Sequence, residues 1–135
     1  MSIEVKISKA RTQEIFDLCK VKAERLLDKE GAVEKICREC ELWLKEVPGV
    51  GDDLKNIPVF ISMVRAYLTK EYTDSSRAVI VKIVATILYC VSPLDIIPDA
   101  FPAGYVDDGG FVALCYLKVK PDVEKYLAWR DGESA

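Results

Sequence analysis

Apolar residues recur at helical spacing along the first third of the chain. From Arg11 to Lys29, and again from Ala32 to Val47, they return every three or four positions with charged residues between them, and Gly31 separates the two segments. The pattern predicts two amphipathic helices. Their inward positions would be Ile15, Phe16, Cys19, Ala23, Leu26 and Leu27 in the first, and Val33, Ile36, Cys37, Cys40, Trp43, Leu44 and Val47 in the second.

A third helix is predicted after the Pro- and Gly-containing turn at residues 48–53. Asp52 and Asp53 suit its N-terminus, because carboxylates are stabilised beside the free amides of a first turn. Pro58 indicates either a late start or a kink in this helix. Its inward positions would be Leu54, Ile57, Phe60, Ile61, Val64 and Leu68.

The segment from Arg77 to Val91 is apolar on nearly every side, which is typical of a helix surrounded by other helices. Its β-branched residues also suit a buried strand, but its length favours a helix. It is shorter than the roughly 20 apolar residues of a membrane span, and it contains Lys82. The preceding run at residues 72–76, YTDSS, supplies a break and an N-cap.

Two further helices are predicted, from Asp107 to Val119 and from Pro121 to about Trp129, because proline favours the first position of a new helix. The fold class predicted is all-α, a compact single domain of five or six helices around a buried apolar central helix. We expect the domain to cover residues 11–130, with tails at 1–10 and 131–135.

Composition agrees with one globular domain. The chain has 135 residues, half of them apolar and 30% charged, and a net charge of −3 that gives no reason to expect a polyanionic partner. The N-terminus has no apolar region of the kind found in secretory signals, so we expect a cytoplasmic location. The odd number of cysteines, five, is then expected to stay reduced.

The stretch YCVSPLDIIPDAFPAGYVDD, residues 89–108, contains three prolines and four aspartates, and no basic residue lies between Lys82 and Lys118. A structural role accounts for each aspartate. Ser92, Pro93 and Asp95 have the form of a capping box with proline at the first helical position. Pro98 and Asp99 suit a type I turn, and Asp107 and Asp108 suit the start of the next helix.

A metal site is the alternative interpretation of the same aspartates. If turns bring Asp95, Asp99, Asp107 and Asp108 together, their mutual repulsion would favour a bound cation, and oxygen ligands suit Mg²⁺ or Ca²⁺. The spacing does not match an EF-hand loop. The chain has no histidine to act beside a metal, yet aspartates can organise phosphoryl transfer through Mg²⁺ alone. A divalent-dependent enzyme therefore stays an alternative.

This stretch resembles the YkvA-like family, a domain of unknown function in which an apolar helix ends in a Tyr-x-x-Ser-Pro-x-Asp-x-Ile-Pro-Asp run followed by a Gly-x-x-Asp-Asp turn. The resemblance covers about residues 66–117. It implies a helical fold with an acidic hinge and no particular activity, and some members look membrane-associated, so a membrane surface is a further possible partner. The matching residues are Tyr89, Ser92, Pro93, Asp95, Ile97, Pro98, Asp99, Pro102, Gly104, Asp107 and Asp108.

This chain departs from the family pattern in two places. The link between Asp99 and Gly104 is one residue shorter, and Gly109 and Gly110 stand where apolar residues are usual. Both departures fall near the acidic turn.

Two other motifs favour ordinary roles. Cys37 and Cys40 have C-x-x-C spacing but lie on the apolar face of a predicted helix, so buried thiols are favoured over a redox or zinc site. The run VPGVGDD, residues 47–53, is similar to a phosphate-binding hairpin, but Asp52 and Asp53 would repel phosphate, which argues against nucleic acid.

The leading hypothesis is a non-catalytic interaction or regulatory module for an unknown protein partner. Its acidic hinge would be formed by Tyr89, Ser92, Pro93, Asp95, Pro98, Asp99 and Gly104.

Overall fold

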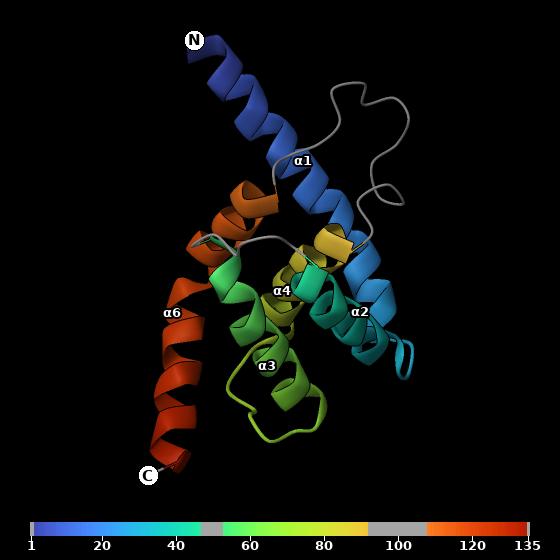
Figure 1. Ribbon diagram of the computed structural model, residues 1–135, viewed down its shortest axis with the longest axis vertical. Coiled ribbons are helices and arrows are strands. Elements are labelled where there is room, and N and C mark those ends of the chain that lie inside the picture. Colours follow the sequence, from blue (N-terminus) through green and yellow to red (C-terminus); the bar gives the residue numbers. More distant parts are fainter. Residues whose placement is uncertain (1, 47–52, 92–107, 135) are drawn as a thin grey trace.

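The computed structural model describes residues 2–46, 53–91 and 108–134. Over these ranges the chain forms helices joined by turns and has no strand, which confirms the all-α prediction (Figure 1). In chain order they are α1 (Ser2–Leu27), α2 (Ala32–Glu46), the 3₁₀ helix η1 (Asp53–Lys55), α3 (Asn56–Leu68), α4 (Arg77–Val91) and α6 (Asp108–Ser134).

Helix α4 is the centre of the domain, as its sequence predicts. It contacts α1, α2, α3 and α6, and every residue from Ile83 to Cys90 is buried. Thr86, a polar residue in this core, satisfies its hydroxyl by donating to the carbonyl of Lys82 at 3.0 Å. An apolar sequence on all sides is what such a position requires, since water reaches almost none of the helix surface.

Local sequence signals set the starts of α2 and α4. Gly31, just before α2, has a φ of +78°, a conformation that glycine adopts at little cost. Ser76 caps α4: its Oγ accepts a hydrogen bond from the Val79 amide at 3.2 Å, and its carbonyl accepts one from Ile80 at 3.2 Å. The bounds of α4 agree with the predicted segment at both ends.

Pro58 produces a late helix start. It is the third residue of α3, where the amide has no partner within the helix, and the single 3₁₀ turn of η1 precedes it. Leu68 was predicted to point inward, and this was wrong: the side chain is 39% exposed. It is the last residue of α3 and lines a hollow on the surface.

The prediction of two helices on either side of Pro121 was also wrong, because α6 continues through this residue. Proline removes one backbone hydrogen bond and crowds the carbonyl of Leu117, which lies on the solvent side with its side chain 73% exposed. Val119 and Val123 are buried on either side of Pro121 and hold both halves against the bundle. The axis of α6 bends about midway along its length, as expected for an internal proline (Figure 1).

Helix α1 begins at Ser2, nine residues before the periodic pattern does. Its N-terminal half projects beyond the other helices (Figure 1). Most of the other positions predicted to point inward are buried. They are Ile15, Phe16, Cys19 and Ala23 in α1; Val33, Ile36, Cys37 and Cys40 in α2; and Ile57, Phe60, Ile61 and Val64 in α3.

Candidate functional site

Most of the predicted acidic hinge lies outside the described residues. This applies to Ser92, Pro93, Asp95, Pro98, Asp99, Gly104 and Asp107, while Asp108 is the first residue of α6. The metal site at the four aspartates therefore stays a prediction. Within the part of the chain that the structure describes, no group of three acidic or thiol side chains is placed to hold a metal ion.

Tyr89 is the described residue of the predicted hinge motif, and it is fully buried. Its ring stacks on Phe111 with 4.1 Å between centroids and 8° between planes, and Phe111 in turn lies 5.5 Å from Phe16. This aromatic ladder joins the end of α4, the start of α6 and the middle of α1. Tyr89 is thus a packing anchor at the border of the acidic stretch.

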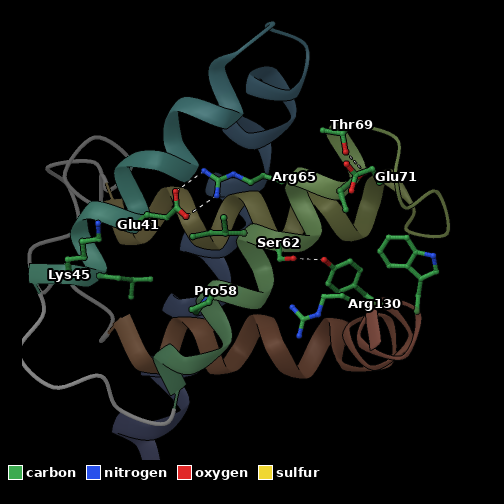
Figure 2. A pocket seen from close by; sticks show the side chains of 13 residues that line it. Glu41, Lys45, Pro58, Ser62, Arg65, Thr69, Glu71 and Arg130 are labelled. Atoms are coloured by element: carbon green, nitrogen blue, oxygen red, sulfur yellow. Dashed lines mark hydrogen bonds and ion pairs between the residues drawn. The ribbon is translucent and has the colours of Figure 1, made fainter. Parts of the chain in front are cut away.

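A hollow of about 840 Å³ lies elsewhere on the described surface, between α2, α3 and α6 (Figure 2). Helix α3 forms its floor, and α2 and α6 form its walls. We call it the α2–α3–α6 groove. It is lined by Glu41, Leu44 and Lys45 of α2; Pro58, Ile61, Ser62, Arg65, Ala66 and Thr69 from α3 and its C-cap; Glu71; and Tyr126, Trp129 and Arg130 of α6.

The α6 wall is aromatic and is tied to the floor. The rings of Tyr126 and Trp129 both pack on Tyr72, with centroids 5.2 and 4.9 Å away. The hydroxyl groups of Ser62 and Tyr126 share a hydrogen bond across the base of the groove (Figure 2). The guanidinium of Arg130 lies 5.8 Å from the centroid of the Tyr126 ring, which is within the range of a cation–π contact.

The α2 wall is fixed by Arg65, which reaches from α3 and binds two carboxylates of α2. Its Nη2 lies 2.8 Å from Glu34 Oε1 and 2.7 Å from Glu41 Oε1, and its Nε and Nη1 make further bonds to the same two carboxylates. Hydrogen bonding from Arg65 lowers the pKa of Glu41. Glu34 and Glu41 are seven residues apart, two turns of one helical face, so one guanidinium can bind both.

Arg65 also separates two hollows. On its other side is a second one, of about 560 Å³, lined in part by Leu27, Val33 and Leu68. Arg65 and Thr69 line both. The clamp formed by Arg65, Glu34 and Glu41 is therefore a fixed polar bar across a largely apolar surface.

The thiols are packing residues, as the sequence predicts. All five cysteines are buried, and none of them forms a disulfide with another described residue. Burial raises the pKa of Cys19, Cys37, Cys40 and Cys115 to about 12, so these four stay protonated at neutral pH. A protonated, buried thiol is a poor nucleophile and a poor metal ligand.

Comparison with known proteins identifies the family. The family described as "Protein of unknown function (DUF1232)" matches residues 79–114. A relative from Bacillus subtilis (strain 168), named "Uncharacterized membrane protein YkvA", is 33% identical over 78 residues, which are 57% of this chain and 74% of that protein. The chain belongs to the YkvA-like DUF1232 family. No solved structure is significantly similar to it.

The DUF1232 match and the groove occupy different parts of the chain. The matched segment contains the apolar helix α4 from Val79 onward, with Tyr89, and the first turns of α6 with Phe111. Every residue that lines the groove lies before or after this segment. Among the described residues, no helix combines the length and the apolar character that crossing a bilayer requires.

Sequence reasoning missed the groove, although two signals for it are present. Ser62, Arg65 and Thr69 place polar side chains at helical spacing along an otherwise apolar α3. Glu34 and Glu41 place two acids on one face of α2. Together these patterns indicate that a polar seam of α3 faces a polar seam of α2.

Proposed function

We propose that this DUF1232 domain is a protein-interaction module whose binding surface is the α2–α3–α6 groove. The observation that supports this most is the groove itself, a hollow of about 840 Å³ formed by three rigid helices. Its interior is apolar through Ile61 on the floor and Leu44 and Trp129 on the walls, and charged side chains stand around its edge. An apolar centre with a polar rim is the usual composition of a protein interface.

A protein partner fits the groove better than a small molecule does. Binding pockets for small molecules usually enclose most of the ligand surface, whereas this groove is open to solvent. The groove also presents tryptophan, tyrosine and arginine, the residue types that most often dominate binding energy at protein interfaces. The acidic hinge predicted from the sequence is a second contact surface under the same proposal.

Site-specific photo-crosslinking in the native host tests this proposal. A photoreactive amino acid is placed at Lys45 or at Thr69, two exposed positions on the groove edge. Matched control positions are Lys35 on α2 and Lys125 on α6, which are exposed and do not line the groove. We expect a discrete protein adduct from the groove positions that is absent from the controls.

The adduct must also depend on the shape of the groove. Trp129→Ala removes part of the α6 wall, and circular dichroism checks that the variant remains folded. We expect Trp129→Ala to abolish crosslinking from Lys45 and Thr69. Adducts that form equally from the control positions, or that persist in a folded Trp129→Ala protein, would contradict the proposal.

Attachment to a membrane surface is a second candidate, because the Bacillus relative is named a membrane protein. Lys20 and Lys118 each lie 5.6 Å from the centroid of the Phe16 ring, so α1 and α6 bring two cations together. Val21 and Leu117, next to them in sequence, are 54% and 73% exposed. Lysines beside exposed apolar side chains favour anionic lipid surfaces.

Flotation with vesicles of phosphatidylcholine, with and without phosphatidylserine, tests this second candidate. We expect binding only when phosphatidylserine is present, and less binding after Lys118→Glu. Failure to float with either vesicle would exclude it, and so would binding that Lys118→Glu leaves unchanged.

A further inference from the structure

The groove is long enough along α3 to accommodate a short helix. Along α3 its lining residues are Pro58, Ile61, Ser62, Arg65, Ala66 and Thr69, which recur every three or four positions over three helical turns. The distance from Pro58 to Thr69, eleven positions along the chain, corresponds to about 16 Å along a helix axis. Each wall contributes three residues at the same helical spacing, i, i+3 and i+4. They are Glu41, Leu44 and Lys45 from α2, and Tyr126, Trp129 and Arg130 from α6.

The backbone around the groove argues for a helical occupant over an extended one. An extended segment needs hydrogen-bond partners for its amides and carbonyls, usually from the edge of a sheet. The walls and floor of this groove are helices, which use their own backbone groups internally. A helix brings its backbone already satisfied and offers side-chain ridges that fit between those of α2, α3 and α6.

The charges around the groove specify the flanks of that helix. Arg65 is committed to Glu34 and Glu41, so the clamp of one guanidinium and two carboxylates adds negative charge to the surface. Lys45 on the α2 wall and Arg130 on the α6 wall are the other cations that line the groove, and both are exposed, as is the acidic Glu71 beyond the end of α3. Arg130 lies 4.0 Å from the exposed Asp131, a contact that an incoming carboxylate could share.

We infer that the groove binds an amphipathic α-helix of about three turns. Its apolar ridge faces Leu44, Ile61 and Trp129, and its acidic residues face Lys45 and Arg130. This inference rests on the proposed function and adds the chemical character of the partner. The acidic residues of the bound helix set its orientation by contacting Lys45 and Arg130. They do not contact Arg65, because Arg65 already binds the carboxylates of Glu34 and Glu41.

Selection from a display library of random 16-residue peptides tests the inference without knowledge of the natural partner. The full chain is the bait, and the selected pool is afterwards tested for binding to the double variant Lys45→Glu/Arg130→Glu. The matched control bait is Lys35→Glu/Lys125→Glu, which makes the same change of charge on the same two helices outside the groove. Individual peptides are then made synthetically and titrated by fluorescence anisotropy.

We expect the selected peptides to share apolar residues at helical spacing with Asp or Glu on the flanks. Each single reversal, Lys45→Glu or Arg130→Glu, should weaken binding about fivefold, the scale expected for an exposed charge pair. The control double variant should bind like the wild type. Replacing the peptide acids with lysine should reverse the preference, so that the Lys45→Glu/Arg130→Glu protein binds more tightly than the wild type.

The failures of the two proposals are distinguishable. Peptides that require the groove but are proline-rich or lack helical periodicity would overturn the helical occupant and leave the interaction module standing. Helical peptides without acidic flanks, unaffected by either charge reversal, would overturn the stated charge complementarity. No selected peptide at all, or peptides that bind Trp129→Ala as well as they bind the wild type, would overturn both. Tight binding of a peptide identical to part of this chain would identify a second copy as the occupant and contradict the inference of a distinct partner.

Discussion

Replacing Arg65 with methionine tests how the groove wall is held in place. Methionine keeps most of the aliphatic length of the side chain and removes the guanidinium, so Glu34 and Glu41 lose their shared cation. A partly exposed ion pair contributes about 0.2–1 kcal/mol, and bidentate geometry favours the upper part of that range. Arg65 makes two such pairs with its side chain one third exposed, so we expect a loss of about 1–2 kcal/mol.

For a chain of 135 residues, this loss corresponds to a fall in Tm of about 4–7 °C. Urea unfolding followed by circular dichroism gives the free energy of unfolding directly. Arg38→Met is the matched control, because Arg38 is an exposed arginine of α2. The difference between Arg65→Met and wild type should shrink in 1 M NaCl, because salt screens exposed charges at about that ionic strength. Equal stability of Arg65→Met and Arg38→Met at low salt would refute the reasoning.

The same variant predicts a pH dependence. Arg65 lowers the pKa of Glu41 in the folded protein, so the folded state binds this proton less readily than the unfolded chain does. The contribution of the pair is present above the unfolded pKa of about 4.3, and it is lost as the pH falls through the lowered folded pKa. Wild type should therefore lose stability below about pH 5 more steeply than Arg65→Met does. Parallel curves for the two proteins would contradict this account.

Four further predictions concern the core, the cap of α4, the thiols and the hinge. Ser76→Ala should lower the free energy of unfolding by about 1 kcal/mol, because the Val79 amide loses its cap; a change within experimental error would contradict the capping role. Tyr89→Ala should cost about 3–5 kcal/mol by removing the ring that stacks on Phe111, and Tyr89→Phe should cost much less in the same urea titration. The five cysteines should resist a thiol reagent at pH 8 in the native protein and react fully in urea; rapid native labelling would disprove their burial. If the aspartates of the acidic stretch are caps and turn formers, Mg²⁺ and Ca²⁺ should leave the Tm of the chelator-treated protein unchanged, whereas an increase that Asp99→Asn abolishes would identify a metal site.

Much of the fold could be predicted because it is encoded locally. The segment from Arg77 to Val91 is apolar on nearly every side, and its length favours a helix enclosed by other helices. Pro121 was misleading because a proline rule considers only the neighbouring backbone. The burial of Val119 and Val123 on the same face of the bundle outweighs the lost hydrogen bond, and this depends on distant parts of the chain.

The groove could not be predicted in the same way because it is a property of three helices together. Glu41, Arg65 and Trp129 are far apart in sequence, and no spacing rule relates them. Sequence reasoning turned instead to the acidic stretch, where prolines and aspartates are concentrated. Local unusual composition is visible in one sequence, whereas a surface assembled from ordinary residues becomes visible only when the helices are packed.

The most direct test of the central claim is to map bound partner on the protein by NMR. The isotope-labelled full chain is titrated with a peptide obtained from the display selection or from a crosslinked partner, and amide shifts are followed residue by residue. Binding in the groove predicts that the largest changes fall on Glu41–Lys45 of α2, on Ile61–Thr69 and on Tyr126–Arg130 of α6, and that Trp129→Ala removes them. Changes concentrated on α1, or on residues 92–108, with those three stretches unaffected, would show that the α2–α3–α6 groove is not the binding surface.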